Sequence, residues 1–198
     1  LSDGSFLVTW ARSHANDQSG IWARQLNADG TIHGAEFRLS TNPTAIEPSI
    51  DSLPNGEFVA TWLVEHAKGY AIEAARFQAN GKRKHGHTVA TPEDGWKSGA
   101  AVTASSDGRY LIAYNTERPT SVDGAAGGVD RDIVMQWYNA EGELQKIEKG
   151  THHLAGNQIL TAASGTKRVL WTDQGDVVLA WDGDAGMGDS SAAHLSIH

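Results

Sequence analysis

The chain contains no cysteine among its 198 residues. A disulfide framework and a thiolate metal site are therefore excluded, and the redox compartment is not indicated. No apolar run approaches the roughly 20 residues of a membrane-spanning helix. No basic-then-apolar leader opens the chain, so we expect a soluble protein and, if it is exported, an already processed one.

Several common signatures are also missing. The sequence has no G-x-S-x-G, Walker A, H-E-x-x-H or dinucleotide-binding motif. No helical stripe of useful length occurs, so we expect almost no helix. The net charge of -8 argues against nucleic acid as the main partner, because phosphate binding requires a basic surface.

A short polar turn that ends in glycine occurs four times. Its copies are Asn27-Ala28-Asp29-Gly30, Gln78-Ala79-Asn80-Gly81, Asn139-Ala140-Glu141-Gly142 and Gly183-Asp184-Ala185-Gly186. Each copy follows a strand-like run, namely IWARQL, IEAARF, IVMQWY and VVLAWD. A further apolar run precedes each of these: GSFLVTW, GEFVATW, GRYLIAY and, more loosely, KRVLWT from Lys167 to Thr172.

The first three repeats share one register. Phe6, Phe58 and Tyr110 follow one another at intervals of 52 residues, as do Trp10, Trp62 and Tyr114. Periods of about 40 to 50 residues with four strands each indicate propeller blades. A β-sandwich would also give many short strands, but it does not explain the 52-residue register.

We therefore predict an all-β fold, a β-propeller of about four blades with four antiparallel strands each. The single domain covers residues 1–198, with blades at about 1–41, 46–90, 98–148 and 157–198. From the innermost strand a to the outermost strand d, the first blade lacks strand a. The alternative is that the chain is a fragment of a larger propeller.

Apolar pairs predict which strands are covered on both faces. Leu7-Val8, Val59-Ala60, Leu111-Ile112 and Val169-Leu170 are apolar on consecutive residues and so belong between neighbouring sheets. In the fourth repeat this assigns Lys167–Thr172 to strand b and Val177–Asp182 to strand c. The alternating segment His194–Ile197 then becomes an outer strand.

The phrase L-x-D-G-x-F-x-V-x-W followed by N-A-D-G resembles the propeller repeat found in tandem in large secreted or surface bacterial proteins. The resemblance covers nearly the whole chain and concerns architecture. It implies a protein that is secreted, displayed on the cell surface or periplasmic. Propellers serve as lectins, lyases, hydrolases and scaffolds, so the resemblance does not assign an activity.

The loops from b to c and from d to a emerge on one face of a propeller, where ligands usually bind. Cationic residues recur there at 52-residue intervals: His14, His66 and Arg118. The neighbouring loops add Glu47, Trp96, Lys97, His152 and His153. Arginine and imidazole would hold an acidic sugar, and Trp96 would offer an apolar platform. The alternative is that these histidines are solvated loop residues aligned by repetition alone.

Two further patterns concern metals. The segment from Glu117 to Arg131 is about ten residues longer than its counterpart, and Asp123, Asp130 and Asp132 are possible calcium ligands there. The alternative is an ordinary polar loop, and no cofactor is certain. The pair His85 and His87 makes no zinc site without further ligands.

The leading hypothesis is a non-catalytic module of an exported bacterial protein that binds a glycan or another surface ligand. An alternative is a carbohydrate-active enzyme, either a polysaccharide lyase or a glycoside hydrolase. The third is a structural or oligomerisation repeat, because an incomplete first blade offers an unpaired edge for self-association or for flanking domains. The sequence leaves open whether the protein is an enzyme.

Overall fold

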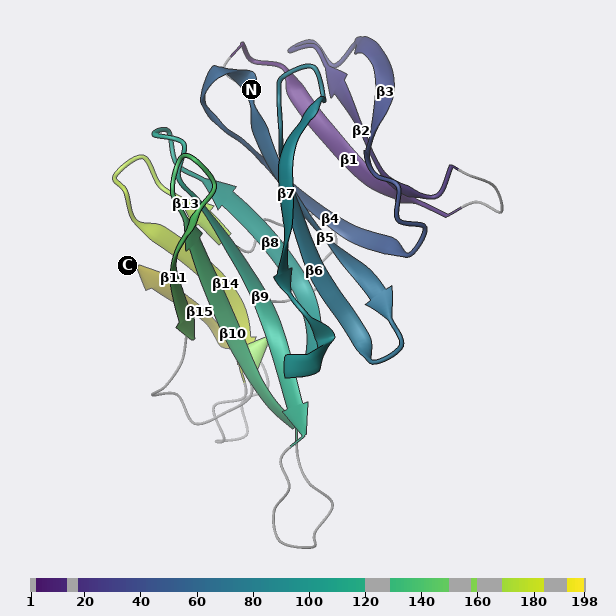
Figure 1. The fold of residues 1–198 in the computed structure, drawn as a ribbon. Coiled ribbons are helices and arrows are strands. Elements are labelled where there is room, and N and C mark those ends of the chain that lie inside the picture. Colours follow the sequence, from purple (N-terminus) through teal and green to yellow (C-terminus); the bar gives the residue numbers. More distant parts are fainter. Residues whose placement is uncertain are drawn as a thin grey trace, which may run out of the picture.

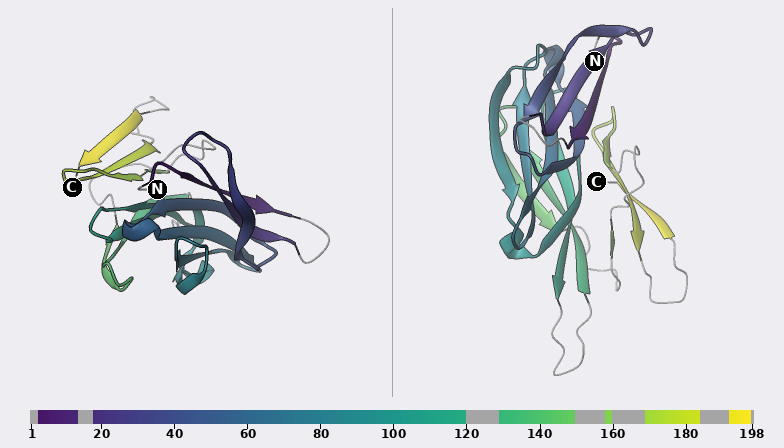
Figure 2. Two further views of the ribbon diagram at one scale, coloured as in Figure 1. Left: turned by 90° about the horizontal axis from the view of Figure 1, so that it is seen from above. Right: turned by 90° about the vertical axis from the view of Figure 1, so that its right-hand side faces the viewer.

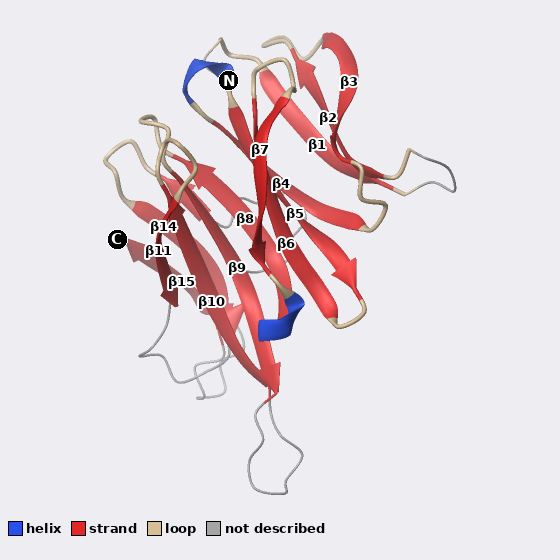
Figure 3. Ribbon diagram, viewed as in Figure 1, coloured by secondary structure: helices blue, strands red, loops and turns tan. Residues whose placement is uncertain are grey.

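The computed structural model describes residues 3–13, 18–119, 129–149, 158–159, 169–183 and 192–197. Within these ranges the chain forms fifteen strands and two single-turn 3-10 helices, η1 (Pro54–Gly56) and η2 (Pro92–Asp94) (Figure 3). The expectation of an all-β chain is confirmed. No helix in the described ranges is long and apolar enough to cross a membrane.

The strands form four antiparallel sheets (Figure 1). Sheet 1 consists of β1 (Phe6–Arg12), β2 (Gly20–Leu26) and β3 (Ile32–Ser40). Sheet 2 consists of β4 (Ala45–Ser52), β5 (Phe58–His66), β6 (Gly69–Phe77) and β7 (Arg83–Ala90). Sheet 3 consists of β8 (Trp96–Ala104), β9 (Tyr110–Pro119), β10 (Val129–Tyr138) and β11 (Leu144–Lys149). Sheet 4 consists of β12 (Gln158–Ile159), β13 (Val169–Trp171), β14 (Val177–Gly183) and β15 (Ala192–Ile197).

Sheets 2 and 3 have the predicted order, in which each strand pairs with the next along the chain. Among the residues that the structure describes, sheet 1 has three strands and lacks an innermost one, as predicted. The repeated turns join the third and fourth strands of these sheets, or β2 and β3 in sheet 1. Gly81 donates to the carbonyl of Gln78 at 2.9 Å, and Gly142 donates to that of Asn139 at 3.0 Å. Their φ angles of 80° and 90° are why glycine ends the motif.

The strand assignment in sheet 4 corrects the prediction for that repeat. β12 and β13 both pair with β14, β12 at Asp182 and Gly183 and β13 at residues 177–179. Together they occupy the innermost position, which β4 and β8 fill in sheets 2 and 3. In the turn after β13, the N–H of Thr172 donates to the carbonyl of Asp176, and that of Gly175 donates to the carbonyl of Thr172. The turn after β8 has the same two backbone bonds, from Ser105 to Arg109 and from Gly108 to Ser105.

β14 is therefore the second strand of its sheet and β15 the third. The Gly175–Trp181 segment has the same length as Gly56–Trp62, and its turn has the hydrogen bonds of the turn after β8. His194–Ile197, expected to be an outer strand, lies in β15, which pairs with β14. The sequence predicts Val169–Trp171 as part of strand b, the second strand, whereas the structure places it in the innermost position. The prediction was wrong because the sequence of this short inner strand resembles an ordinary apolar strand.

Side chains of each inner strand bond to the backbone of the next inner strand. The Asp51 carboxylate on β4 accepts from the backbone N–H of Ala104 at 3.0 Å and from the Thr103 hydroxyl at 3.2 Å. Thr103, on β8, in turn accepts from the backbone N–H of Trp171 on β13 at 2.9 Å. Inner strands are sheet edges, whose outward N–H groups need partners. The preceding sheet supplies them.

Apolar side chains fill the spaces between successive sheets, which follow one another in chain order (Figure 2). Pairs that share a cluster across these three spaces are Ile21 with Phe58, Leu63 with Tyr110, and Leu111 with Val177. Burying each such large side chain stabilises the fold by roughly 1.5–3 kcal/mol. Face-to-face packing therefore supplies much of the stability between sheets.

Two residues expected between sheets are exposed. Val59, Ala60, Leu111 and Ile112 are buried as predicted, whereas Val8 is 45% exposed and Leu170 is 46% exposed. Val8 lies in sheet 1 and Leu170 in sheet 4, the two ends of the series. Their outward faces have no neighbouring sheet among the described residues to cover them.

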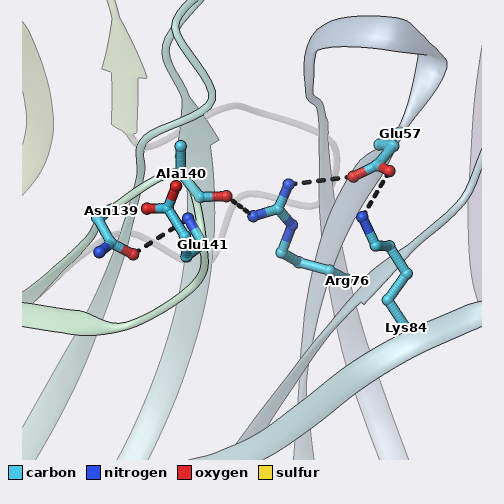
Figure 4. A network of polar contacts seen from close by, with 6 residues as sticks. All are labelled: Glu57, Arg76, Lys84, Asn139, Ala140 and Glu141. Carbon is cyan, nitrogen blue, oxygen red and sulfur yellow. Dashed lines mark hydrogen bonds and ion pairs between the residues drawn. The ribbon is translucent and has the colours of Figure 1, made fainter.

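A polar network joins the outer parts of sheets 2 and 3 (Figure 4). Arg76 on β6 donates to the carbonyl of Ala140, in the repeated turn of sheet 3, and pairs with Glu57 at 3.1 Å. Lys84 contacts the other oxygen of Glu57 at 2.7 Å. The hydrogen bond from Lys84, with a smaller one from Arg76, holds the pKa of Glu57 below its usual range. Arg76 thus fixes the turn against the preceding sheet.

Replacing Asp51 with alanine tests the inner-strand contact. The variant leaves the N–H of Ala104 and the hydroxyl of Thr103 without this acceptor in a partly buried setting, so we expect a loss of about 1–3 kcal/mol in unfolding free energy. Urea denaturation measures it. Asp51→Asn keeps an acceptor oxygen and serves as the control, with a smaller loss. Equal stability of Asp51→Ala and the wild type would contradict the role given to Asp51.

Candidate functional site

The residues expected on one rim lie at one end of sheets 2 and 3. The hairpin between β5 and β6, the start of β8 and the far end of β9 all reach this end (Figure 1). Trp96 opens β8 rather than lying in a loop, and it pairs with Glu117 on β9. The neighbour of Glu117 in sequence is Arg118, whose backbone pairs with that of Asp130.

Trp96 presents a large aromatic surface to solvent, with 58% of it exposed. Its ring meets Tyr70 edge-on, with centroids 6.2 Å apart and planes at 71°. It also lies over Gly69, where an added Cβ would be 3.6 Å from the indole Cδ2 and 3.8 Å from the Cβ of Pro92. The ring is thus held in place on one side while the other side stays open.

His66 is the last residue of β5 and is exposed. It pairs across the hairpin with Gly69, the residue under the Trp96 ring. The fold therefore brings His66 and Trp96 to neighbouring positions from different sheets, with Glu117 opposite Trp96 across the β8–β9 ladder. We call the group of His66, Gly69, Tyr70 and Trp96 the Trp96 site. Whether it binds a ligand stays a prediction.

Lys97 does not face this rim as the sequence suggested. It is only 2% exposed, and its ammonium donates to the carbonyl of Gly95 at 2.9 Å and to the hydroxyl of Thr116 at 3.2 Å. A buried lysine is stable only when its charge is met by hydrogen bonds. Lys97 therefore closes the η2 turn beside Trp96 and holds the start of β8.

The remaining predicted site residues are placed as follows. His14, His152, His153 and Asp123 lie outside the described residues. Asp130 and Asp132 do not lie in a loop, because β10 already begins at Val129; likewise β9 continues to Pro119. Among the residues with a described placement, no group of three His, Cys, Asp or Glu side chains is arranged to hold a metal ion. Calcium binding around Asp123 remains a prediction.

Glu47 has a strained backbone near this end of sheet 2. It lies in a bulge of β4, where the pairing with β5 shifts between Ile46 and Ser49, and its φ is 49°. The corresponding bulge in β8 lies between Ser98 and Ala101 and carries Gly99, with a φ of 60°. A positive φ favours glycine, and strained non-glycine residues cluster at functional sites. Glu47 is exposed, so its carboxylate is available to solvent.

Replacing Glu47 with glycine should stabilise the protein. The backbone strain would be relieved, as it already is at Gly99, and we expect a gain of up to about 1 kcal/mol in unfolding free energy. Chemical denaturation checks the change. Glu47→Gln keeps the strain while removing the charge and should leave stability nearly unchanged. Destabilisation by the glycine variant would show that Glu47 stabilises the folded state.

Two histidines of β7 lie between sheets 2 and 3. The ring of His85 packs against Gly142 so closely that a Cβ there would overlap it, and the ring centroid of His87 lies 5.0 Å from that of Tyr138. Their buried Nε2 atoms have no hydrogen-bond partner within the described part of the chain. Burial is the main cause that lowers the pKa of each, and the charges of Arg76 and Lys84 add to it at His85.

These lowered pKa values predict a loss of stability in mild acid. Above a pH of about 6.5 both histidines are neutral, whether the chain is folded or unfolded. As the pH falls below that value, the unfolded chain takes up protons that the folded chain does not, so the unfolding free energy decreases. Thermal melts between pH 7 and pH 5 measure this decrease.

His85→Phe provides the matched variant, because Phe37 of sheet 1 packs against Gly81 of sheet 2 as His85 of sheet 2 packs against Gly142 of sheet 3. We expect the variant to lose less stability than the wild type over the same pH range. A pH dependence unchanged by His85→Phe would contradict the contribution of His85.

Comparison with known proteins now bears on this fold. No protein-family model matches the chain, and neither does any curated protein. Among solved structures it is similar to the GH93 alpha-L-arabinofuranosidase of Fusarium graminearum in complex with arabinobiose. The TM-score is 0.51 at 13% sequence identity. The architecture is propeller-like.

The match covers 97% of this chain and 59% of the arabinofuranosidase chain. At this low identity it shows the fold alone, and it supports the propeller predicted from the repeats. The four sheets are accordingly called blades below. Blade 1 comprises β1–β3, blade 2 β4–β7, blade 3 β8–β11 and blade 4 β12–β15.

Two features of the site were not recognised in the sequence. Tyr70, which supports the Trp96 ring, lies in a part of the repeat that has no equivalent aromatic in the other blades. The strain at Glu47 had a signal, because Gly99 follows it by 52 residues. A glycine aligned with a glutamate in a strand indicates a bulge with positive φ.

Proposed function

We propose that this chain is a glycan-binding propeller module whose ligand stacks on Trp96. The exposed, laterally supported indole ring is the observation that carries the proposal. A large aromatic ring that its neighbours hold on one side and that is open on the other offers a preorganised contact surface. An indole also presents a flat apolar face that suits the C–H face of a pyranose or furanose ring.

The neighbouring groups supply the polar contacts that such a site requires. His66, on the adjacent hairpin, is exposed and able to donate to or accept from a sugar hydroxyl. Tyr70 and Gly69 hold the ring in one orientation, which lowers the entropy lost on binding. In our proposal Arg118 adds a cationic donor from the next blade, which would favour an acidic sugar.

Two further considerations support a carbohydrate ligand. The similar solved structure is an arabinofuranosidase bound to arabinobiose, so a related architecture accommodates a small sugar. The tandem phrase resembles repeats of secreted or surface bacterial proteins, which supports placing the module in an exported protein.

Binding to an array of neutral and uronate-containing oligosaccharides, followed by calorimetry, tests the proposal. Trp96→Ala should weaken binding about tenfold or more through loss of the stacking surface, and His66→Ala should weaken it several-fold. Ile147→Ala is the matched control, because Ile147 on β11 is 55% exposed and lies away from the site. Absence of any glycan ligand, or unchanged affinity in Trp96→Ala, would overturn the proposal.

Glycoside hydrolysis is the second candidate, favoured by the strained, exposed carboxylate of Glu47 near the same end of blade 2. Enzymes often hold catalytic residues in strained conformations. The calorimetry samples can be analysed for released sugar and for unsaturated product absorbance. Turnover that is abolished in Glu47→Gln would favour hydrolysis over binding alone.

A further inference from the structure

Blade 1 presents an uncovered apolar face on β1. Phe6 is 56% exposed and Val8 is 45% exposed, and Trp10 on the same face is half-buried. These side chains alternate along the strand and point away from blade 2, since Thr9 and Leu7 occupy the other face. We call Phe6, Val8 and Trp10 the β1 face.

The equivalent positions in blade 2 show what normally covers such a face. Phe58, Ala60 and Trp62 follow the three residues by 52 positions and are 1%, 0% and 0% exposed. They are buried in a cluster with Ile21 and Ala23 of blade 1. A propeller sheet packed on the β1 face would therefore bury residues of the same kind in the same register.

Blade 4 presents the opposite type of face at the other end of the series. Leu170 on β13 is 46% exposed, and Val178 on β14 is half-buried. Val178 corresponds in strand register to Val59 in blade 2 and Leu111 in blade 3, which are 1% and 0% exposed. We call Leu170 and Val178 the β13 face. In blades 2 and 3 this type of face is covered by the following blade.

Strand register favours a copy of this chain as the occupant, because each copy carries both halves of a contact between blades. The arginines beside the β1 face are already engaged within blade 1. Arg12 and Arg24 contact Glu36 at 2.9 Å and 3.6 Å, and Arg12 and Arg38 lie over the ring of Trp22, at 4.3 Å and 5.7 Å from its centroid. The β1 face is thus an apolar surface bordered by arginines that have partners, and apolar packing carries the proposed contact.

We infer that two copies of this chain associate head to tail, with the β13 face of one copy packed on the β1 face of the other. The contact continues the interface between blades that the structure already forms three times within one chain. Because the two faces differ, each copy keeps one face open after pairing. Such heterologous contacts give closed rings or open assemblies rather than symmetric dimers.

Sedimentation velocity of the 198-residue chain across a range of concentrations tests the inference. The wild type should associate as concentration rises. Phe6→Glu and Leu170→Glu should each remain monomeric over the same range, with a dissociation constant for self-association at least tenfold higher than that of the wild type. Val8→Lys is a second variant of the β1 face and should behave as Phe6→Glu does. Ile147→Glu, at an equally exposed apolar residue outside both faces, should associate like the wild type. Circular dichroism confirms that each variant is folded.

A mixture of the two blocked variants distinguishes this contact from every symmetric one. Phe6→Glu keeps an intact β13 face, and Leu170→Glu keeps an intact β1 face, so together they should form a 1:1 dimer that grows no further. A wild type that stays monomeric at all concentrations would overturn the inference. Association that survives Phe6→Glu, or a mixture that fails to pair, would overturn it as well.

Discussion

The arrangement of the blades depends on the hydrogen-bonding needs of the inner strands. An inner strand is a sheet edge, and its outward N–H groups must find acceptors. Asp51 meets that need at Ala104 in the next blade, and Thr103 meets it at Trp171 in the blade after. Because each acceptor lies at one position of its strand, these contacts also set the position of each blade relative to its neighbour along the strand direction. Apolar packing gives the blades their affinity, and the inner-strand bonds give them their register.

The ends of the series are where this pattern stops. Leu170 stands at the position held by Asp51 and Thr103, and a leucine side chain cannot accept a hydrogen bond. Phe6 and Val8 stand where buried residues stand in the following blades. Apolar surface without a neighbouring blade thus appears at both ends of the described series. In contrast, the Trp96 site combines residues of two blades that are already packed together, so its ring is held before any ligand arrives.

Much of the fold could be predicted from the sequence, because the 52-residue register sets the same residues in the same strand positions. Phe58 and Tyr110 are buried as that register requires. The fourth blade was misassigned because its inner strand is divided between β12 and β13, which hid the match between Gly175–Trp181 and Gly56–Trp62. The burial of Lys97 could not be predicted, since nothing in the sequence indicates that Gly95 and Thr116 converge on its ammonium. Support of Trp96 by Tyr70 likewise depends on contact between two blades.

Amide hydrogen exchange followed by NMR tests the inner-strand constraint most directly. If the preceding blade satisfies these edge groups, the amides of Ala104 and Trp171 exchange as slowly as amides inside the sheets. In Asp51→Ala, the amide of Ala104 should exchange faster while that of Trp171, whose acceptor is Thr103, stays protected. Rapid exchange of both amides in the wild type, at the rate of exposed turn residues, would contradict the account.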